Sequence, residues 1–154
     1  MRRSDREIKD FNEVADVLRR ADTIRLGING KPFPYVVPLS FGFTAENGGI
    51  TIYIHGAGEG FKHDLLKEDN NVCVETDIFH RYAQTETSIT AEYESVIGFG
   101  KAEIADMEEA EKGMGLLLEH CGFPGYDYNK KALERTRVYK ITLESFTGKR
   151  RVTG

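Results

Sequence analysis

The sequence predicts a mainly β protein with added helices, folded as a small closed or split antiparallel barrel. About six strand-like runs follow one another along the chain, and most are linked by short turns rather than by the helices of βαβ units. Further helical segments are inserted after the first strands. The 154 residues contain no internal repeat and no Pro/Gly/Ser-rich linker. We therefore expect a single domain that covers residues 1–154.

Apolar residues at helical spacing predict helices, and two of these begin with capping residues. Asp10 and Asp106 each stand three residues before a glutamate, the spacing of a capping box with Asp in place of Ser or Thr. The face of the third helix carries Met107 and Met114, and we expect it to pack on the core. The expected helices cover residues 10–21, 61–69, 106–121 and 130–135.

Alternating apolar residues, bounded by turn signals such as Asn47-Gly48-Gly49, predict the strands. The polar segment 77–90 shows no period and is expected to be irregular, and 148–151 is expected to form a basic tail. The expected strands cover residues 23–29, 35–43, 50–55, 72–76, 93–104 and 138–143.

Composition narrows the class of partner. The formal net charge is −4, which argues against nucleic acid or an anionic membrane as the main partner. No run reaches the roughly 18 apolar residues of a membrane span, and no apolar run follows the basic N-terminus. Cys73 and Cys121 lack CxxC spacing, and the four histidines lack metal-site spacing. We expect a cytoplasmic protein with two reduced core thiols and no metal.

The segment from Gly56 to Lys62 is the first candidate site. Three glycines in five residues allow close backbone approach to a ligand and present several N–H groups. A helix that starts directly afterwards adds unpaired N–H groups, and Lys62 adds a full charge for a phosphate. A glycine-rich surface turn with a solvated lysine explains the same residues. His55, beside this loop, is either a group that faces a ligand ring or a hydrogen-bonded structural histidine.

The strand 35–43 is the second candidate. Pro38 interrupts an apolar run, so the strand cannot be fully hydrogen-bonded at that point. Its free edge groups could meet a flat polar ligand such as a flavin ring. Alternatively, the proline only protects an edge strand from aggregation.

Three motifs occur in a characteristic order: 34–39 (PYVVPL), 52–57 (IYIHGA) followed by Gly60 and Lys62, and 93–103 (YESVIGFGKAE). Together they resemble the pyridoxamine 5′-phosphate oxidase-like flavoproteins, in particular the nitroimidazole-resistance branch. The resemblance runs from about residue 3 to residue 150. It implies a six-stranded Greek-key split β-barrel that forms a homodimer, with two FMN sites at the subunit interface.

The resemblance also implies roles for individual residues. Lys62 matches the lysine that holds the FMN phosphate, and Phe61 stands where the oxidases carry an arginine beside it. Ser95 falls where the second subunit contributes a polar contact, and Lys149 is a further candidate for the phosphate. The remaining matched positions form the strand along the isoalloxazine ring and the strand end beside the ribityl chain: Val37, Pro38, Leu39, Ser40, His55, Gly56 and Ala57.

The implied function is an FMN-dependent oxidoreductase that reduces small, for example nitroaromatic, compounds with electrons from NAD(P)H. His55 is the candidate catalytic residue. Phe61 in place of the arginine, and a C-terminus without the oxidases' substrate motif, argue against vitamin B6 chemistry. One alternative is a non-catalytic protein that binds flavin, the deazaflavin F420 or haem, with His55 or His63 as the haem ligand. Another is a dimeric interaction module without a cofactor.

Overall fold

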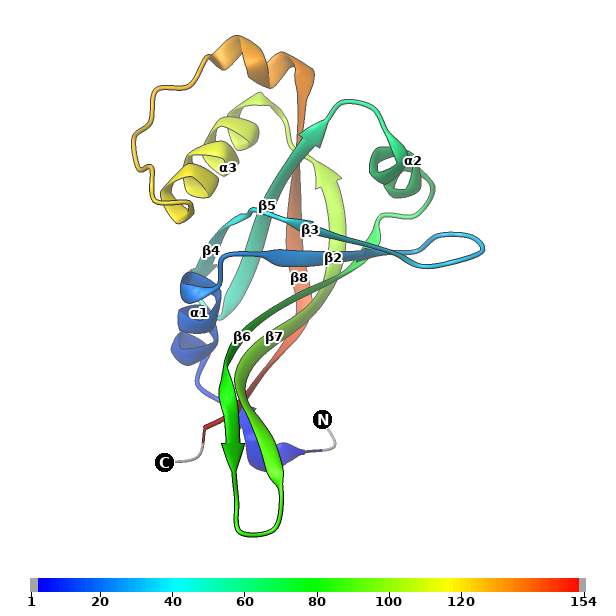
Figure 1. The fold of residues 1–154 in the computed structure, drawn as a ribbon. Helices are drawn as coiled ribbons and strands as arrows, with labels where there is room; N and C mark the ends of the chain where they lie inside the picture. Colours follow the sequence, from blue (N-terminus) through cyan, green and yellow to red (C-terminus); the bar gives the residue numbers. More distant parts are fainter. Residues whose placement is uncertain (1–2, 153–154) are drawn as a thin grey trace.

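The computed structural model describes residues 3–152, and one antiparallel sheet forms its body (Figure 1). The sheet contains eight strands in the order β3-β2-β6-β7-β8-β5-β4, and β1 pairs with β8. The strands are β1 (Glu7–Ile8), β2 (Ile24–Ile28), β3 (Tyr35–Leu39), β4 (Gly42–Glu46), β5 (Gly49–Ala57), β6 (Asn71–Gln84), β7 (Ile89–Ile104) and β8 (Thr136–Arg151).

The mainly antiparallel β architecture confirms the predicted class, but the count of six strands was wrong. The run 35–43 is not one strand, because the chain turns at Ser40 and Phe41 and places β3 and β4 at opposite edges of the sheet. Phe41 is fully buried at this turn. The additional strand β1 has only two residues, too few for a periodic pattern in the sequence. The sheet is therefore open: its two edge strands, β3 and β4, do not pair with each other, although the short turn at residues 40–41 connects them.

The helices begin where the capping residues predict. The Asp10 carboxylate accepts the backbone N–H of Asn12 at 2.7 Å, and Asp106 accepts that of Glu109 at 2.9 Å. The helices are α1 (Phe11–Arg20), α2 (Phe61–Glu68) and α3 (Met107–His120), with 3₁₀ turns η1 (Ser4–Arg6) and η2 (Lys130–Arg135). In the part of the chain that the structure describes, no helix is long and apolar enough to cross a membrane.

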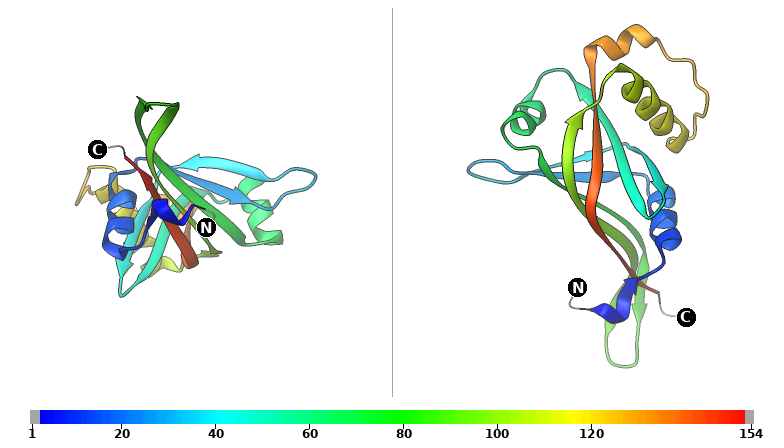
Figure 2. Two further views of the ribbon diagram at one scale, coloured as in Figure 1. Left: turned by 90° about the horizontal axis from the view of Figure 1, so that it is seen from below. Right: turned by 180° about the vertical axis from the view of Figure 1, so that it is seen from behind.

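The core lies inside the curled sheet, where α1 packs on β6 and β7 (Figure 2). Alternate residues of the strands point into it, and so does one face of α1. Burial of these side chains supplies the main driving force for folding. The fully buried aliphatic residues are Val17, Leu18, Ile24, Leu26, Ile28, Ile50, Ile52, Ile54 and Ile141.

The polar segment 77–90 is a regular hairpin rather than irregular chain. β6 and β7 continue as a two-stranded ribbon that projects from the body, with a bulge between Phe79 and Arg81 (Figures 1 and 2). Because the ribbon leaves the core, its residues no longer alternate between apolar and polar. Residues 148–151 are likewise not a loose tail, since they pair with β7 and β1.

The predicted core face of α3 is only partly buried. Ala110 and Leu117 are buried, whereas Met107 is 54% exposed at the start of the helix. Both cysteines are free, as expected, but Cys121 is exposed and Cys73 only half-buried. The expectation of two core thiols was therefore wrong for Cys121, which lies just past the end of the helix.

Candidate functional site

The end of β5, a glycine loop and the start of α2 form one continuous strand–loop–helix unit. Buried Ile52, Tyr53 and Ile54 hold β5 in the sheet. The next residues, 55–57, still pair with residues 136–138 of β8, which carries the strand end beyond the core. Gly60 then begins α2 with φ +123°, a conformation that side chains rarely adopt.

Lys62 folds back across this strand end. Its Nζ donates to the carbonyl oxygen of His55 at 3.3 Å. A Cβ at Gly56 would lie 2.7 Å from the same Nζ, so only glycine leaves room for the lysine there. Burial lowers the pKa of Lys62. Lys62 is thus a half-buried cation without an anionic partner among residues 3–152, and an anionic group would compensate its lost hydration.

His55 lies at the rim of the same unit. Burial, followed by the charge of Lys62, lowers the pKa of His55. This lowered pKa favours the neutral imidazole, which can donate one hydrogen bond and accept another. Part of its side chain remains exposed, so a ligand above the strand end can reach it.

The second candidate strand, β3, is an edge strand as Pro38 predicts. It pairs only with β2, and Pro38 stands opposite Arg25. Val37 and Leu39 pack on the core, whereas Pro38 and Ser40 are exposed. The free edge of this strand keeps backbone groups available for a ligand.

Two aromatic rings connect this edge to the glycine loop. Tyr35 of β3 and Phe61 of α2 meet edge to face, with ring centroids 5.1 Å apart. The structure therefore brings the start of β3 next to the start of α2. Phe61, which the resemblance places where the oxidases carry an arginine, makes an aromatic contact here.

Ser95 and Lys149 lie elsewhere. They stand opposite each other on β7 and β8. Arg137, opposite Gly56, precedes Lys149 by twelve residues of β8, which is about 40 Å of extended strand. Figure 1 shows β8 running from one end of the molecule to the other. Within one chain, Lys149 therefore lies far from Lys62, and its expected role at the phosphate stays a prediction.

Arg137 is a candidate that the sequence did not reveal. It pairs with Gly56, so its side chain leaves the sheet on the face across which Lys62 lies. Its Nε is 3.8 Å from a Cβ placed at Gly58. The side chain is exposed and forms no ion pair with any residue between 3 and 152. Some 75 residues separate it from Lys62, so no motif could have joined them.

These features fit the phosphate end of a flavin nucleotide. The glycines allow close backbone approach, Lys62 and Arg137 supply two positive charges, and the N-terminus of α2 adds unpaired N–H groups. The edge of β3 provides a flat flank for a ring. Fold and site together define an open antiparallel β-sheet with an anion cradle.

A family model described as pyridoxamine 5′-phosphate oxidase matches residues 10–150. The chain belongs to this family, which confirms the resemblance seen in the three sequence motifs. No functionally curated protein matches the chain.

Solved structures agree with this assignment. A candidate 5-nitroimidazole antibiotic resistance protein from Bacteroides thetaiotaomicron is 30% identical, with a TM-score of 0.82 over 93% of this chain and 85% of that one. This similarity supports the nitroimidazole-resistance branch. The flavocytochrome Anf3 from Azotobacter vinelandii shares the fold at 20% identity, with a TM-score of 0.81 over 99% of this chain and 72% of that one. A FAD and heme binding protein from Mycobacterium smegmatis shares it at 13% identity, with a TM-score of 0.71 over 96% and 74%.

Proposed function

We propose that this protein binds FMN, with the phosphate on the Gly56–Lys62 loop and the isoalloxazine ring along β3. The observation that carries this proposal is the half-buried Lys62, folded over a glycine that leaves room for it. A phosphate would receive charge-assisted hydrogen bonds from this lysine and from Arg137. Membership in the family and the flavin-binding relatives support a flavin cofactor.

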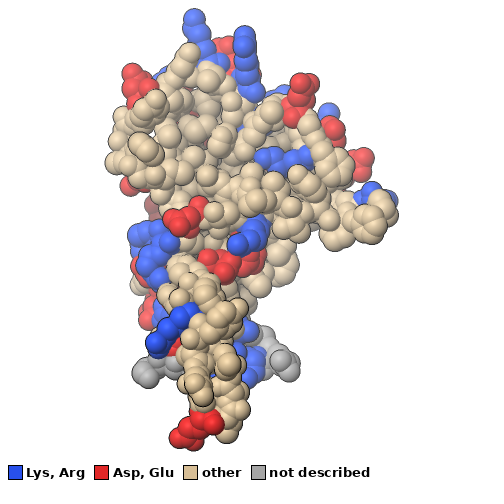
Figure 3. Space-filling model, viewed as in Figure 1, with Lys and Arg blue, Asp and Glu red and all other residues tan. Residues whose placement is uncertain are grey.

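The flavin site is completed by a second copy of the chain. Ser95 and Lys149 are too far from Lys62 to share a ligand within one chain, but a partner can supply them. An apolar outer surface along β6 and β7 suits such a homodimer. In Figure 3 the projecting ribbon is largely uncharged between a few basic groups and its acidic tip. The exposed large apolar residues of these strands are Phe79, Tyr82, Ile89, Ile97, Phe99 and Ile104.

We further propose that the protein is an oxidoreductase that reduces small, for example nitroaromatic, compounds with electrons from NAD(P)H. The bound flavin supplies the hydride chemistry, and the chain binds and orients the reactants. The neutral His55, at the rim of the loop, would donate a hydrogen bond to the substrate and so act as the catalytic residue. The 30% identity to the candidate nitroimidazole resistance protein favours this substrate class.

A non-catalytic flavin or haem protein is the second candidate, favoured by the flavocytochrome and the FAD and heme binding relative. His63 is the less accessible axial ligand, because it is partly buried and its Nδ1 is hydrogen-bonded to the Tyr139 hydroxyl at 2.5 Å, so that only its Nε2 could bind iron. His55 has an exposed ring and is the better one. A Soret band in the purified protein would favour haem, and bleaching of a flavin band by NADPH would favour the enzyme over the carrier.

Titration of the apoprotein with FMN and with riboflavin tests the proposed phosphate site. Lys62→Ala should weaken FMN binding about 10- to 100-fold, because one charge-assisted hydrogen bond is worth about 1.5–3 kcal/mol. Riboflavin binding should stay within about twofold of wild type. Lys67→Ala, on the exposed side of the same helix, should change neither. An equal loss for both ligands would remove Lys62 from the phosphate role.

A further inference from the structure

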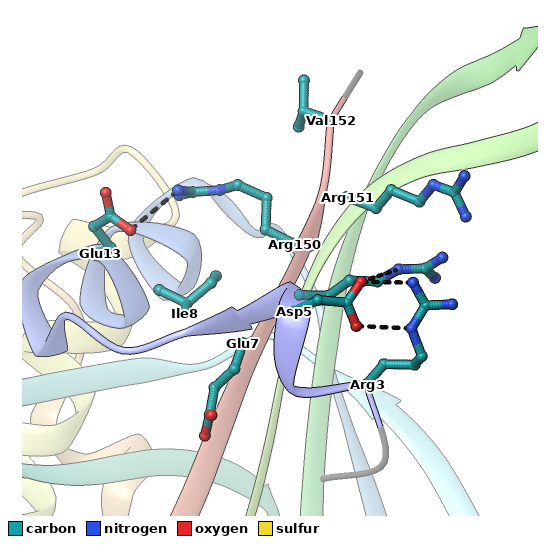
Figure 4. A pocket seen from close by; sticks show the side chains of 9 residues that line it. Arg3, Asp5, Glu7, Ile8, Glu13, Arg150, Arg151 and Val152 are labelled. Carbon is teal, nitrogen blue, oxygen red and sulfur yellow. Dashed lines mark hydrogen bonds and ion pairs between the residues drawn. The ribbon is translucent and has the colours of Figure 1, made fainter. Parts of the chain in front are cut away.

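A second concave site lies at the opposite end of the molecule, where η1 and β1 lie against the end of β8 (Figure 4). The cavity measures about 450 Å³ and is open to solvent. Four arginines and three acidic residues line it, so its chemistry depends on which charges neutralise one another. The lining residues are Arg3, Asp5, Arg6, Glu7, Ile8, Glu13, Arg150, Arg151 and Val152.

Two of the four arginines are fully paired. Two guanidinium nitrogens of Arg3 donate hydrogen bonds to the two carboxylate oxygens of Asp5, at 2.7 and 2.5 Å. Arg150 reaches the buried Glu94 at 2.6 Å with its Nε, and Glu13 at 3.1 Å with its Nη1. The charges of these two arginines are therefore committed to the fold.

The other two arginines are not neutralised in this way. Arg6 approaches Asp5 only to 4.0 Å, and that carboxylate already accepts two hydrogen bonds from Arg3. Arg151 has no acidic group within 4.0 Å among residues 3–152. In Figure 4 its guanidinium extends to the same side as that of Arg3, whereas the Glu7 carboxylate points away from both.

Tyr93 adds a hydroxyl to these cations. It stands directly opposite Arg151 in the β7–β8 pair, so both side chains leave the same face of the sheet. The Nζ of Lys149 lies 5.6 Å from the Tyr93 ring centroid. Burial favours the neutral phenol, but hydrogen bonding to Lys149 and Arg6 outweighs it and lowers the pKa of Tyr93. The phenol is thus surrounded by positive charge.

We propose that Arg6, Arg151 and Tyr93 form an oxyanion site for the phosphoryl group of a small molecule. Guanidinium groups match the geometry of phosphate oxygens, and the phenol donates a further hydrogen bond. A chain of net charge −4 has no general excess of cations, so two arginines mark a local feature: Arg151, with no acidic group within 4.0 Å among residues 3–152, and Arg6, which shares the Asp5 carboxylate with Arg3. Neither Lys62 nor Arg137 takes part, since both lie at the far end of β8.

The identity of the phosphoryl compound follows from the dimer, and this part rests on the proposed function. If Ser95 and Lys149 of one subunit face the flavin of the other, the oxyanion site lies on the same outer face, next to that flavin. The compound is then a reactant at the ring, such as a phosphorylated nicotinamide dinucleotide, or the flavin nucleotide itself.

Calorimetric titration of the full chain with inorganic pyrophosphate tests the site. Arg151→Gln should weaken binding about tenfold, and Tyr93→Phe about threefold, with a steep loss in high salt. The matched control is Lys101→Gln, which removes a charge from the same face of β7 and should leave affinity within about twofold. Thermal unfolding shows that each variant is folded.

Displacement of pyrophosphate distinguishes the source of the phosphoryl group. If NADPH displaces pyrophosphate and FMN does not, the compound is the dinucleotide. If FMN displaces it and riboflavin does not, the compound is the flavin nucleotide. Absence of pyrophosphate binding to wild type, or equal losses in Arg151→Gln and Lys101→Gln, would overturn the proposal. Lys62→Ala separates the two sites: it should weaken FMN binding and remove any pyrophosphate bound at the Lys62 loop, whereas the pyrophosphate binding that Arg151→Gln weakens should stay unchanged, so either site can fail without the other.

Discussion

At the scale of single residues, the proposed phosphate site depends on Gly56 and Lys62. The lysine crosses the strand end only because position 56 has no Cβ, which would lie 2.7 Å from Nζ. The obstructed atom is the far end of a flexible side chain. Adding a methyl group there displaces the lysine without breaking the fold.

Gly56→Ala should therefore weaken FMN binding about tenfold, by about 1.4 kcal/mol, because Lys62 loses its position against the phosphate. Stability should change by less than about 1 kcal/mol. Gly115→Ala is the control, since nothing lies within 4 Å of a Cβ at that exposed helical position. It should stabilise the protein by about 0.5–1 kcal/mol and leave flavin binding unchanged. Fluorescence titration and thermal unfolding measure both effects, and unchanged FMN affinity in Gly56→Ala would contradict the proposed lysine geometry.

The local chemistry of the loop could be read from the sequence, and its distant neighbours could not. Glycines before a helix with a lysine in its first turn are compatible with an anion site and with a surface turn, and the resemblance to the family favours the anion site. Arg137 comes from a strand some 75 residues later, and only the register of β5 against β8 brings it close. Lys149 belongs to the same strand but lies about 40 Å from Arg137 along it, and no sequence motif predicts this distance.

At the scale of elements, the long strand β7 carries a charged cluster into the core. Glu94 is buried, yet its carboxylate accepts hydrogen bonds from Arg20, Arg150 and His80 at 2.6–3.1 Å. The hydrogen bond from Arg20 and, after the opposing effect of burial, those from Arg150 and His80 lower the pKa of Glu94 to about 2. The cluster ties β7 to α1, to β8 and to the bulged ribbon.

This cluster predicts a pH dependence of stability. A carboxylate whose folded pKa is depressed contributes stability that is complete above its ordinary pKa of 4.5 and is lost as the pH falls towards 2. The contribution is about 3 kcal/mol. Glu94→Gln should lower the free energy of unfolding by about this amount at pH 7, and the deficit should shrink between pH 4.5 and 2. Urea unfolding at several pH values measures it.

Glu103→Gln, at an exposed position of the same strand, is the control and should leave both stability and its pH dependence unchanged. A deficit in Glu94→Gln that stays constant down to pH 2 would show that the network is not the source of the effect.

Element types were easier to predict than element extents. Capping at Asp10 and Asp106 and the alternation in β2 and β5 are local signals, and the structure confirms them. The ribbon 77–90 was missed because strand periodicity comes from one buried face, and this hairpin leaves the core. The division of 35–43 into two edge strands depends on how the whole sheet curls, which no window of sequence contains.

At the scale of the whole molecule, the open sheet places the two halves of the proposed flavin site far apart in one chain. The loop before α2 lies towards one end of β8 (Figure 1), whereas Ser95 and Lys149 pair with each other towards its other end. A homodimer that buries the apolar outer surface of β6 and β7 would join the halves of different chains. The flavin would then depend on the dimer, and the dimer would gain stability from the flavin.

The most direct test is sedimentation equilibrium of the protein with FMN, followed at the flavin absorbance band. We expect the flavin to sediment at twice the 17.4 kDa mass of the chain, with one FMN per chain. Tyr82→Glu, which places a charge on the exposed apolar ribbon, should shift the protein to monomer and release the flavin. Flavin that sediments with a monomer, or a dimer that takes up no FMN, would contradict the account.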